Sequence, residues 1–354
     1  MRANRTELYE MSERVVLPGF VDLHVHLREP GFSHKETIAT GLAAAKRGGY
    51  AAVVAMPNTE PPPDCPANLE KATNGYKKNP KIPVFPTGCI SAHRAGTAPA
   101  AYEELAPFVC GYSDDGSGIA DNGLMREAMQ RVKALGKPIL SHCEDLTQSG
   151  NAMEWKALER DLNLVVQTEC RYHMCHCSAR ESVALLREAK RAGLPVTAET
   201  APHYLTLLAN GSPLPSHKMN PPLARCADQA ALLEAIQDGT IDCIATDHAP
   251  HTAAEKEAGA NGVVGLETAF PVLYTKLVLT EVISLEKLLD LMAYRPAELL
   301  LRWTSGNAEP FRPLEMASYT WDLVSAYTID PAQFASMGRY TPFAGWKVRG
   351  RCLG

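Results

Sequence analysis

The stretch PGFVDLHVHLREPG, residues 18–31, decides the fold. Its apolar beginning reads as a buried strand, predicted over 16–27, that carries the motif His24-Val25-His26 near its end. Because side chains alternate across a strand, His24 and His26 point to the same side. Two imidazoles side by side make half of a zinc site. For this motif alone, a pair of hydrogen-bonded core histidines is an equally good interpretation.

Outward from this stretch, short apolar runs alternate with amphipathic stretches, which predicts βα units and a parallel sheet. After the first strand, we predict strands at 50–56, 82–90, 108–113, 138–142, 172–177, 196–200 and 241–246, and helices at 35–47, 124–135, 182–192 and 230–237. Eight strands with intervening helices predict an α/β fold, a closed (β/α)₈ TIM barrel. An open doubly wound sheet is the alternative, but no GxGxxG follows the first strand.

The composition is that of a globular protein with a large core. The chain has 354 residues, 45% of them apolar and 21% charged, with a net charge of −5. No basic run indicates nucleic-acid binding, no apolar core of a signal peptide is visible, and no run approaches the roughly 18 apolar residues of a membrane span. The ten cysteines form no CxxC pair, so we expect thiols in a reducing cytoplasm.

Polar residues follow the predicted strands where a barrel enzyme has its site, at the carboxyl ends. After strands one, four, five, six and eight come His24, His26, Asp115, His142, His176 and Asp247. A single histidine at a strand end is more often structural, but the joint pattern favours a metal site. Imidazole and carboxylate suit borderline divalent metals. Six groups exceed the ligands of one catalytic zinc and suit two ions that share a carboxylate.

With these residues in view, the sequence resembles the dihydroorotases of the bacterial barrel-type class, in the amidohydrolase superfamily. The resemblance is carried, in order, by residues 18–31 and by AMPNT (55–59), SDDG (113–116), SHCED (141–145), YHMCH (172–176), KMNPPL (218–223), IATDHAPHT (244–252), GLETAFP (265–271) and TPFAGWKVRG (341–350). It implies reversible cyclisation of N-carbamoyl-L-aspartate to L-dihydroorotate, a step of pyrimidine biosynthesis, with two zinc ions per chain.

The resemblance also implies the roles of the six residues. His24 and His26 bind one zinc, His142 and His176 bind the other, Asp115 bridges both, and Asp247 contacts the first and acts as general acid and base. The related hydantoinases and allantoinases bridge their metals with a carbamylated lysine, whereas Asp114-Asp115-Gly116 favours the Asp-bridged dihydroorotases. Asp114 is expected to support the site or to cap a helix.

Substrate binding is expected beside the metals. Arg28 shares the face of His26 and suits a bidentate contact with the substrate carboxylate, although an arginine exposed at the rim is the alternative. Asn58, Asn220 and His251 match other substrate contacts of the family, while Asn220 in its Pro-rich loop could simply form a turn. The remaining candidates, which match a loop whose backbone contacts the pyrimidine edge, are Asn261 and Gly262.

The other histidines and cysteines near these motifs are expected to be structural or to support the ligands. The histidines are His173, His203 and His248. Cys143, Cys175 and Cys177 read as small buried residues. By strand alternation, Cys175 and Cys177 should point away from His176.

The chain departs from the family at its ends, and two alternatives follow. We expect a barrel over 16–305, with 1–15 and 306–354 as the remnant of a small β-domain. The chain is thus expected to be a shortened version of the family. The connection 145–154 is also short, and Glu60 replaces a common Arg. The partners implied are a second copy, in a homodimer, and possibly aspartate carbamoyltransferase. The alternatives are another cyclic amidohydrolase, such as a hydantoinase or allantoinase, and a non-catalytic subunit that scaffolds that transcarbamoylase.

Overall fold

The computed structural model describes residues 14–76, 82–209, 214–313 and 316–354. Its barrel strands are β2 (Phe20–Val25), β3 (Tyr50–Ala55), β4 (Val84–Pro86), β5 (Gly88–Cys89), β6 (Tyr112–Ser113), β7 (Pro138–Ser141), β8 (Arg171–Met174), β9 (Val196–Thr200) and β10 (Cys243–Ile244). Its α-helices are α1 (Ile38–Arg47), α2 (Pro66–Thr73), α3 (Tyr102–Leu105), α4 (Asn122–Ala134), α5 (Ala152–Thr168), α6 (Arg180–Arg191), α7 (Pro202–Thr206), α8 (Cys226–Asp238), α9 (Ala253–Glu257), α10 (Ala269–Leu273), α11 (Leu285–Leu289) and α12 (Arg295–Thr304). Within the described ranges, no helix has the length and apolarity needed to cross a membrane.

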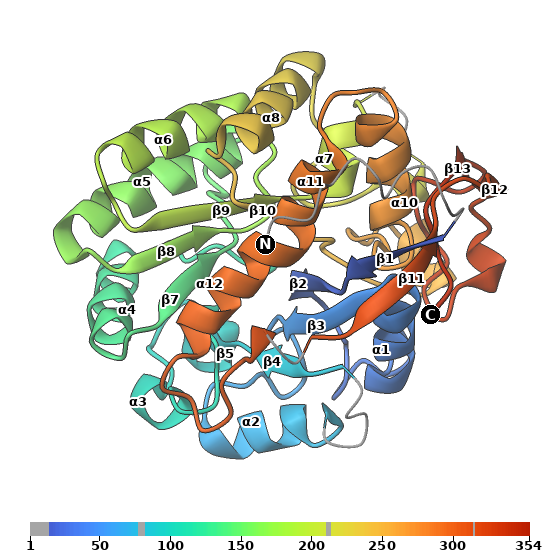
Figure 1. Cartoon of the computed structure of the whole chain (residues 1–354). Coiled ribbons are helices and arrows are strands. Elements are labelled where there is room, and N and C mark those ends of the chain that lie inside the picture. The colour runs from blue at the N-terminus through green and yellow to red at the C-terminus, as the bar shows by residue number, and fades with distance from the viewer. Residues whose placement is uncertain (1–13, 77–81, 210–213, 314–315) are drawn as a thin grey trace, which may run out of the picture.

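The parallel strands form a ring with helices around its outside (Figure 1). The hydrogen-bonded orders are β2-β3-β4 and β10-β9-β8-β7-β6-β5. Strands β4 and β5 are parts of one strand interrupted at Thr87, whose N–H donates to the Ala55 carbonyl at 3.1 Å. The ring closes after β10, where Val25 and His248 form a parallel bridge and the His26 N–H donates to the His248 carbonyl at 2.9 Å. The predicted TIM barrel is therefore confirmed.

The predicted strand 16–27 is wrong in one respect, because it is two strands. Strand β1 (Arg14–Pro18) ends at Gly19, and β2 begins at the next residue. A Cβ on Gly19 would lie 2.5 Å from the Cβ of Ala51 and 2.6 Å from the Ala317 carbonyl oxygen, so only glycine allows this close approach. The chain changes sheet there, and β1 leaves the barrel.

Several other predicted elements are shorter than expected. The strands predicted at 108–113 and 241–246 are reduced to β6 and β10. The helix predicted from Lys35 begins at Ile38, because Thr37 and Thr40 form a capping box in which each side chain accepts the other residue's N–H.

The inside of the barrel is filled by apolar side chains and closed at one end by α12. Leu23, Val54 and Leu140 belong to one buried cluster with Leu300 and Trp303 of α12. Lys137, just before β7, donates to the Trp303 carbonyl at 2.9 Å, so α12 lies at the amino ends of the strands. The carboxyl ends are thereby left as the open end, where polar strand-end residues can meet a substrate.

A small antiparallel sheet from the two ends of the described chain packs beside the barrel. Its order is β1-β11-β14, with β11 (Ser318–Asp322) and β14 (Arg351–Cys352); β12 (Tyr327–Thr328) and β13 (Lys347–Val348) form a separate hairpin-like pair. Trp321 of β11 packs on Phe20 and Phe270, with ring centroids 5.4 and 4.4 Å apart. The predicted β appendage is confirmed as a feature of the fold, while residues 1–13 of the predicted segment 1–15 lie outside the described residues.

Candidate active site

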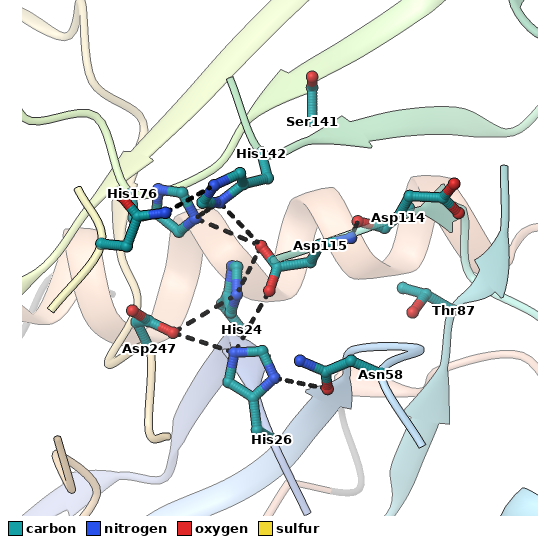
Figure 2. Close-up of polar contacts among 12 residues, drawn as sticks. His24, His26, Asn58, Thr87, Asp114, Asp115, Ser141, His142, His176 and Asp247 are labelled. Carbon is teal, nitrogen blue, oxygen red and sulfur yellow. Dashed lines mark hydrogen bonds and ion pairs between the residues drawn. The ribbon is translucent and has the colours of Figure 1, made fainter. Parts of the chain in front are cut away.

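All six predicted ligands meet at the carboxyl end of the barrel, around Asp115 (Figure 2). The Oδ1 atom of Asp115 lies 3.4 Å from His24 Nε2, 3.6 Å from His142 Nδ1 and 3.3 Å from His176 Nε2. Its Oδ2 atom lies 3.4 Å from His26 Nε2. All of these side chains are buried. The Asp115 carboxylate thus lies close to all four imidazoles. A ligand that bridges two metal ions would occupy such a position.

The cluster divides into two halves that share Asp115. In one half, Asp247 Oδ1 lies 3.1 Å from His26 Nε2 and 3.6 Å from His24 Nε2. In the other, His142 Nδ1 lies 3.0 Å from His176 Nε2. Ligands about 2.1 Å from a tetrahedral zinc lie about 3.4 Å from one another. The donor atoms of both halves therefore have the spacing of ligands around a common cation.

The polar atoms of the cluster also lack a sufficient set of partners within the protein. His24 Nε2 is buried and has no hydrogen-bond partner in the described residues. Burial would lower the pKa of His24, but the Asp115 carboxylate holds that pKa well above its usual range. For His142, burial likewise acts downward, but hydrogen bonds to Asp115 and Glu144 raise the pKa to about 9. Buried carboxylates thus demand positive charge here, and the donor set fits a divalent metal.

Two outer partners orient the imidazoles of β2. His26 Nδ1 lies 2.8 Å from Asn58 Oδ1, and His24 Nδ1 lies 2.8 Å from Glu199 Oε1. Because each acceptor takes a proton from Nδ1, the lone pair of Nε2 faces the cluster in both rings. Burial raises the pKa of Glu199, but hydrogen bonds from His173 and His24 lower it to about 2. Glu199 was missed by the sequence analysis.

Strained backbone marks the ends of the strands that carry the site. His176 has φ 36°, Asp247 has φ 48° and Arg28 has φ 62°, all in the left-handed region that residues with side chains rarely adopt. Such conformations concentrate at functional sites, where surrounding contacts hold them. Asp22 supplies one such contact, since it accepts hydrogen bonds from the Thr246 hydroxyl at 2.6 Å and from the His24 N–H at 3.1 Å.

Arg28 is buried beside the cluster, so the interpretation as an exposed rim arginine is wrong. Its Nε donates to the Pro250 carbonyl at 3.1 Å, and its Nη2 lies 3.3 Å from His251 Nε2. Burial, followed by the charges of Arg28 and Lys35, lowers the pKa of His251 to about 3. His251 is therefore neutral near pH 7, and its Nε2 accepts a hydrogen bond from Arg28 Nη2.

The other predicted substrate contacts lie around the same opening. Asn58 orients His26, and Asn220 Nδ2 donates to Glu144 Oε1 at 2.9 Å and lies 3.3 Å from His142 Nε2. Asn261 is exposed. Gly262 has φ 124°, and a Cβ there would lie 3.2 Å from the His251 ring, so the loop packs directly on His251.

A buried lysine fastens this loop. Lys256 is 1% exposed, and its Nζ donates to the carbonyls of Lys218, Ala260 and Gly262 at 2.9, 2.8 and 2.7 Å. The Gly262 N–H also donates to the Lys218 carbonyl at 3.0 Å. The segment after β10 is thereby joined to the segment that carries Asn220.

Replacing Lys256 by Met should loosen this loop. Three carbonyls would lose a donor, so we expect the free energy of unfolding to fall by about 1–3 kcal/mol. Substrate KM should rise because the loop that packs on His251 becomes mobile. Denaturant unfolding and limited proteolysis within 249–262 measure both effects. Lys276→Met, at a lysine that lies over the Trp346 ring, is the control; equal effects in the two variants would contradict the assignment.

Other expectations near the cluster are partly corrected. Asp114 does not cap a helix but accepts hydrogen bonds from the Ile90 N–H at 2.8 Å and from Ser91, which holds the preceding loop. Cys175 was expected to point away from His176, and its sulfur lies instead within 4.8 Å of ligand atoms of His24 and Glu199.

The predicted supporting histidines lie close to the site. His173 bonds Glu199, and His248 bonds Glu36 at 3.3 Å. Burial lowers the pKa of His203 to about 4. Arg94 was missed: its Nη2 donates to the backbone carbonyls of Asp114 and Asp115. No sequence motif marks Arg94, because its position depends on contacts with residues distant in sequence.

Comparisons with known proteins show the family of the chain. A family model described as dihydro-orotase-like matches residues 13–160. Dihydroorotases of Bacillus thuringiensis (strain Al Hakam) and Bacillus anthracis (strain A0248) are 42% identical to the chain over 376 residues, which cover 98% of the chain and 87% of each relative. An L-hydantoinase (dihydropyrimidinase) from Arthrobacter aurescens shares the fold, with a TM-score of 0.82 and 24% identity over 96% of this chain and 83% of that one. The chain belongs to the dihydroorotase family.

Proposed function

We propose that this chain is a dihydroorotase that catalyses the reversible cyclisation of N-carbamoyl-L-aspartate to L-dihydroorotate with release of water. The observation that carries the proposal is the convergence of four imidazoles on Asp115, with Asp247 against two of them. A non-catalytic scaffold has no need of this buried donor set. The similarity to hydantoinases concerns the fold, whereas the relatives at 42% identity are dihydroorotases.

The donor set suits two zinc ions. His24, His26 and Asp247 would hold one, His142 and His176 the other, and Asp115 both. When bound, such a pair supplies an activated water and polarises the carbonyl that reacts. The chain's own part is to present the lone pairs of the imidazoles in fixed directions and to keep the carboxylates buried and unprotonated.

Asp247 is the residue we assign to proton transfer. Burial raises its pKa, but the hydrogen bond from His26 and the charges of the neighbouring histidines bring that pKa below its usual range. The carboxylate is therefore ionised, and its place beside His26 and His24 is what supports the proposal that it carries a proton from the attacking water to the ring nitrogen that leaves. In the biosynthetic direction the same carboxylate takes the proton from the carbamoyl nitrogen.

The substrate carboxylate is assigned to Arg28. Its Nε and Nη2 already contact Pro250 and His251, and Nη1 has no hydrogen-bond partner in the described part of the chain. Held from both sides, the guanidinium is presented without rotational freedom, which favours a planar carboxylate. Asn58, Asn220, His251, Asn261 and Gly262 are proposed to border the same pocket.

Arg28→Lys tests this assignment. The change keeps the charge but loses the forked geometry, so we expect kcat/KM for dihydroorotate to fall about 10- to 100-fold, mostly through KM, as for the loss of a hydrogen bond to a charged group. Steady-state kinetics measure it. Arg131→Lys, in an exposed ion pair with Glu103, is the matched control, and an unchanged KM in Arg28→Lys would refute the role.

The wider assignments follow from the family. The proposed barrel domain spans 16–305 except for residues 16–18 of β1, which pair with β11 and belong with the other described residues to the appendage. A cytoplasmic homodimer that receives its substrate from an aspartate carbamoyltransferase is the proposed assembly. Light scattering of the purified chain, alone and with that enzyme, tests it.

The decisive experiment measures metal content together with turnover on a panel of cyclic amides. We expect close to two zinc ions per chain and hydrolysis of dihydroorotate in preference to hydantoin and allantoin. A metal-loaded chain that prefers hydantoin would make it a hydantoinase. A chain that binds no metal and turns over none of the three would support the scaffold.

A further inference from the structure

Beneath the cluster, a buried carboxylate joins two histidines of different strands. Glu199 of β9 is 1% exposed. Its Oε1 lies 2.8 Å from His24 Nδ1 and its Oε2 lies 3.2 Å from His173 Nε2. Each oxygen therefore serves one ring, and one of those rings is a proposed ligand while the other is not.

The proton positions along this chain of contacts follow from the chemistry of the groups. An ionised carboxylate only accepts, so His24 donates from Nδ1 and His173 donates from Nε2. His173 Nδ1 lies 2.8 Å from Thr197 Oγ1, and since that nitrogen carries the lone pair, the hydroxyl donates to it. The Trp303 ring, 5.0 Å from the His173 ring, packs against it. Each group in this chain of contacts therefore either donates or accepts at a defined atom. The Nε2 atom of His24 carries its lone pair toward Asp115 and Asp247.

The two imidazoles of β2 are held by chemically different partners. His26 Nδ1 bonds the neutral amide oxygen of Asn58, and His24 Nδ1 bonds the charged carboxylate of Glu199. Both partners fix the tautomer, but only the carboxylate makes its imidazole a stronger electron donor. His24 is thereby distinguished from His26 as a ligand.

A separate metal site in the same place is the competing explanation. Ligand atoms of His173, Glu199 and Cys243 lie within 4.8 Å of one another. However, both ring nitrogens of His173 already have partners, and burial holds the pKa of the Cys243 thiol well above its usual range. These groups satisfy one another without an ion.

We propose that Glu199, itself held by His173, is a positioning residue that fixes the tautomer and orientation of His24 and strengthens it as a metal ligand. The inference rests on the two-cation site of the proposed function. It predicts that one of the two bound ions, the one held by His24, depends on a network that never touches it.

Zinc titration of the metal-free chain against a chromophoric chelator tests the proposal, with wild type, Glu199→Gln and Asp228→Asn compared. In Glu199→Gln the shape is kept, but one of the two imidazole N–H groups then faces an NH₂ donor. We expect one ion to bind about 10- to 100-fold more weakly, as for loss of an outer partner of a ligand, and the other to bind as in wild type. Asp228 is a buried carboxylate that bonds Asn151 and the Arg180 N–H, so its variant should bind both ions normally.

His173→Asn is a second variant for the same zinc titration, and it replaces Glu199→Gln if that variant does not fold. It leaves the contact between Glu199 and His24 in place but removes the support of the carboxylate. We expect a smaller weakening of the same ion, and in the double variant less than the sum of the two effects, because the residues act through one path. With Co²⁺ in place of zinc, only one of two visible absorption components should change.

The outcomes separate the inference from the proposed function. If wild type binds two zinc ions and Glu199→Gln or His173→Asn binds both as tightly as wild type, the inference fails while the proposed function stands. If wild type binds no zinc, the proposed function fails. Equal weakening of both ions in Glu199→Gln would also overturn the inference, because it would indicate general loss of structure.

Discussion

Replacing Asp247 by Asn is expected to reduce kcat for dihydroorotate hydrolysis by about 10³- to 10⁴-fold, the range for loss of a general acid and base. Asparagine keeps the size of the side chain and can still meet His26, which lies 3.1 Å from the carboxylate. It cannot accept a proton from water or return one to nitrogen. Substrate KM should change little, because Arg28 and His251 are untouched.

Metal analysis of the same variant separates chemistry from assembly. His142, His176 and Asp115 remain, so at least one zinc ion per chain should be retained. Asp238→Asn, which removes an exposed carboxylate paired with Arg187, is the control and should have wild-type turnover. A kcat within about tenfold of wild type in Asp247→Asn would be too small a loss for a general acid and base, and another residue would then have to move the proton.

Asp115→Asn should abolish measurable turnover and remove at least one of the two ions. The carboxylate contacts four imidazoles through both oxygens, and an amide offers only one oxygen as a ligand. Loss of several kcal/mol of metal stabilisation corresponds to a decrease of about 10³-fold or more in kcat/KM. Metal content and kinetics on the same sample measure both.

The neighbouring residue provides a matched control. Asp114 is also buried, but its oxygens accept hydrogen bonds from Ile90 and Ser91. Asp114→Asn should therefore keep both ions and lose stability, seen as a lower Tm. If Asp114→Asn loses metal and Asp115→Asn keeps it, the bridging assignment belongs to the wrong aspartate.

The convergence of the six proposed ligands could be predicted from sequence because their signal is local. Each lies where an apolar run ends, so the barrel rule alone brings distant positions such as His24 and Asp247 to one rim. Glu199 could not be found this way. It lies inside β9 rather than after it, and nothing in VTAET (196–200) says that its partners come from β2 and β8.

The errors have physical causes of the same kind. Pro18-Gly19 is a turn signal within the apolar run, but the sequence does not show that Ala51 and Ala317 lie close to Gly19 and so require a glycine there. Alternation relative to His176 says nothing of the closeness of Cys175 to His24, which belongs to another strand. Arg28 was expected to be either a substrate contact or an exposed rim residue, and its burial depends on Pro250, more than 200 residues away.

The closure of the barrel next to Asp247 has a consequence for how the enzyme is made. The backbone contact between His26 and His248 joins segments that leave the ribosome far apart in time, and it adjoins the residues assigned to the first cation. That cation's pocket is therefore completed only when the last barrel strand docks on the first. A nascent chain that has not yet released β10 would hold only His24 and His26 of the three residues proposed for this ion, so the complete set could form only after the first and last barrel strands have met.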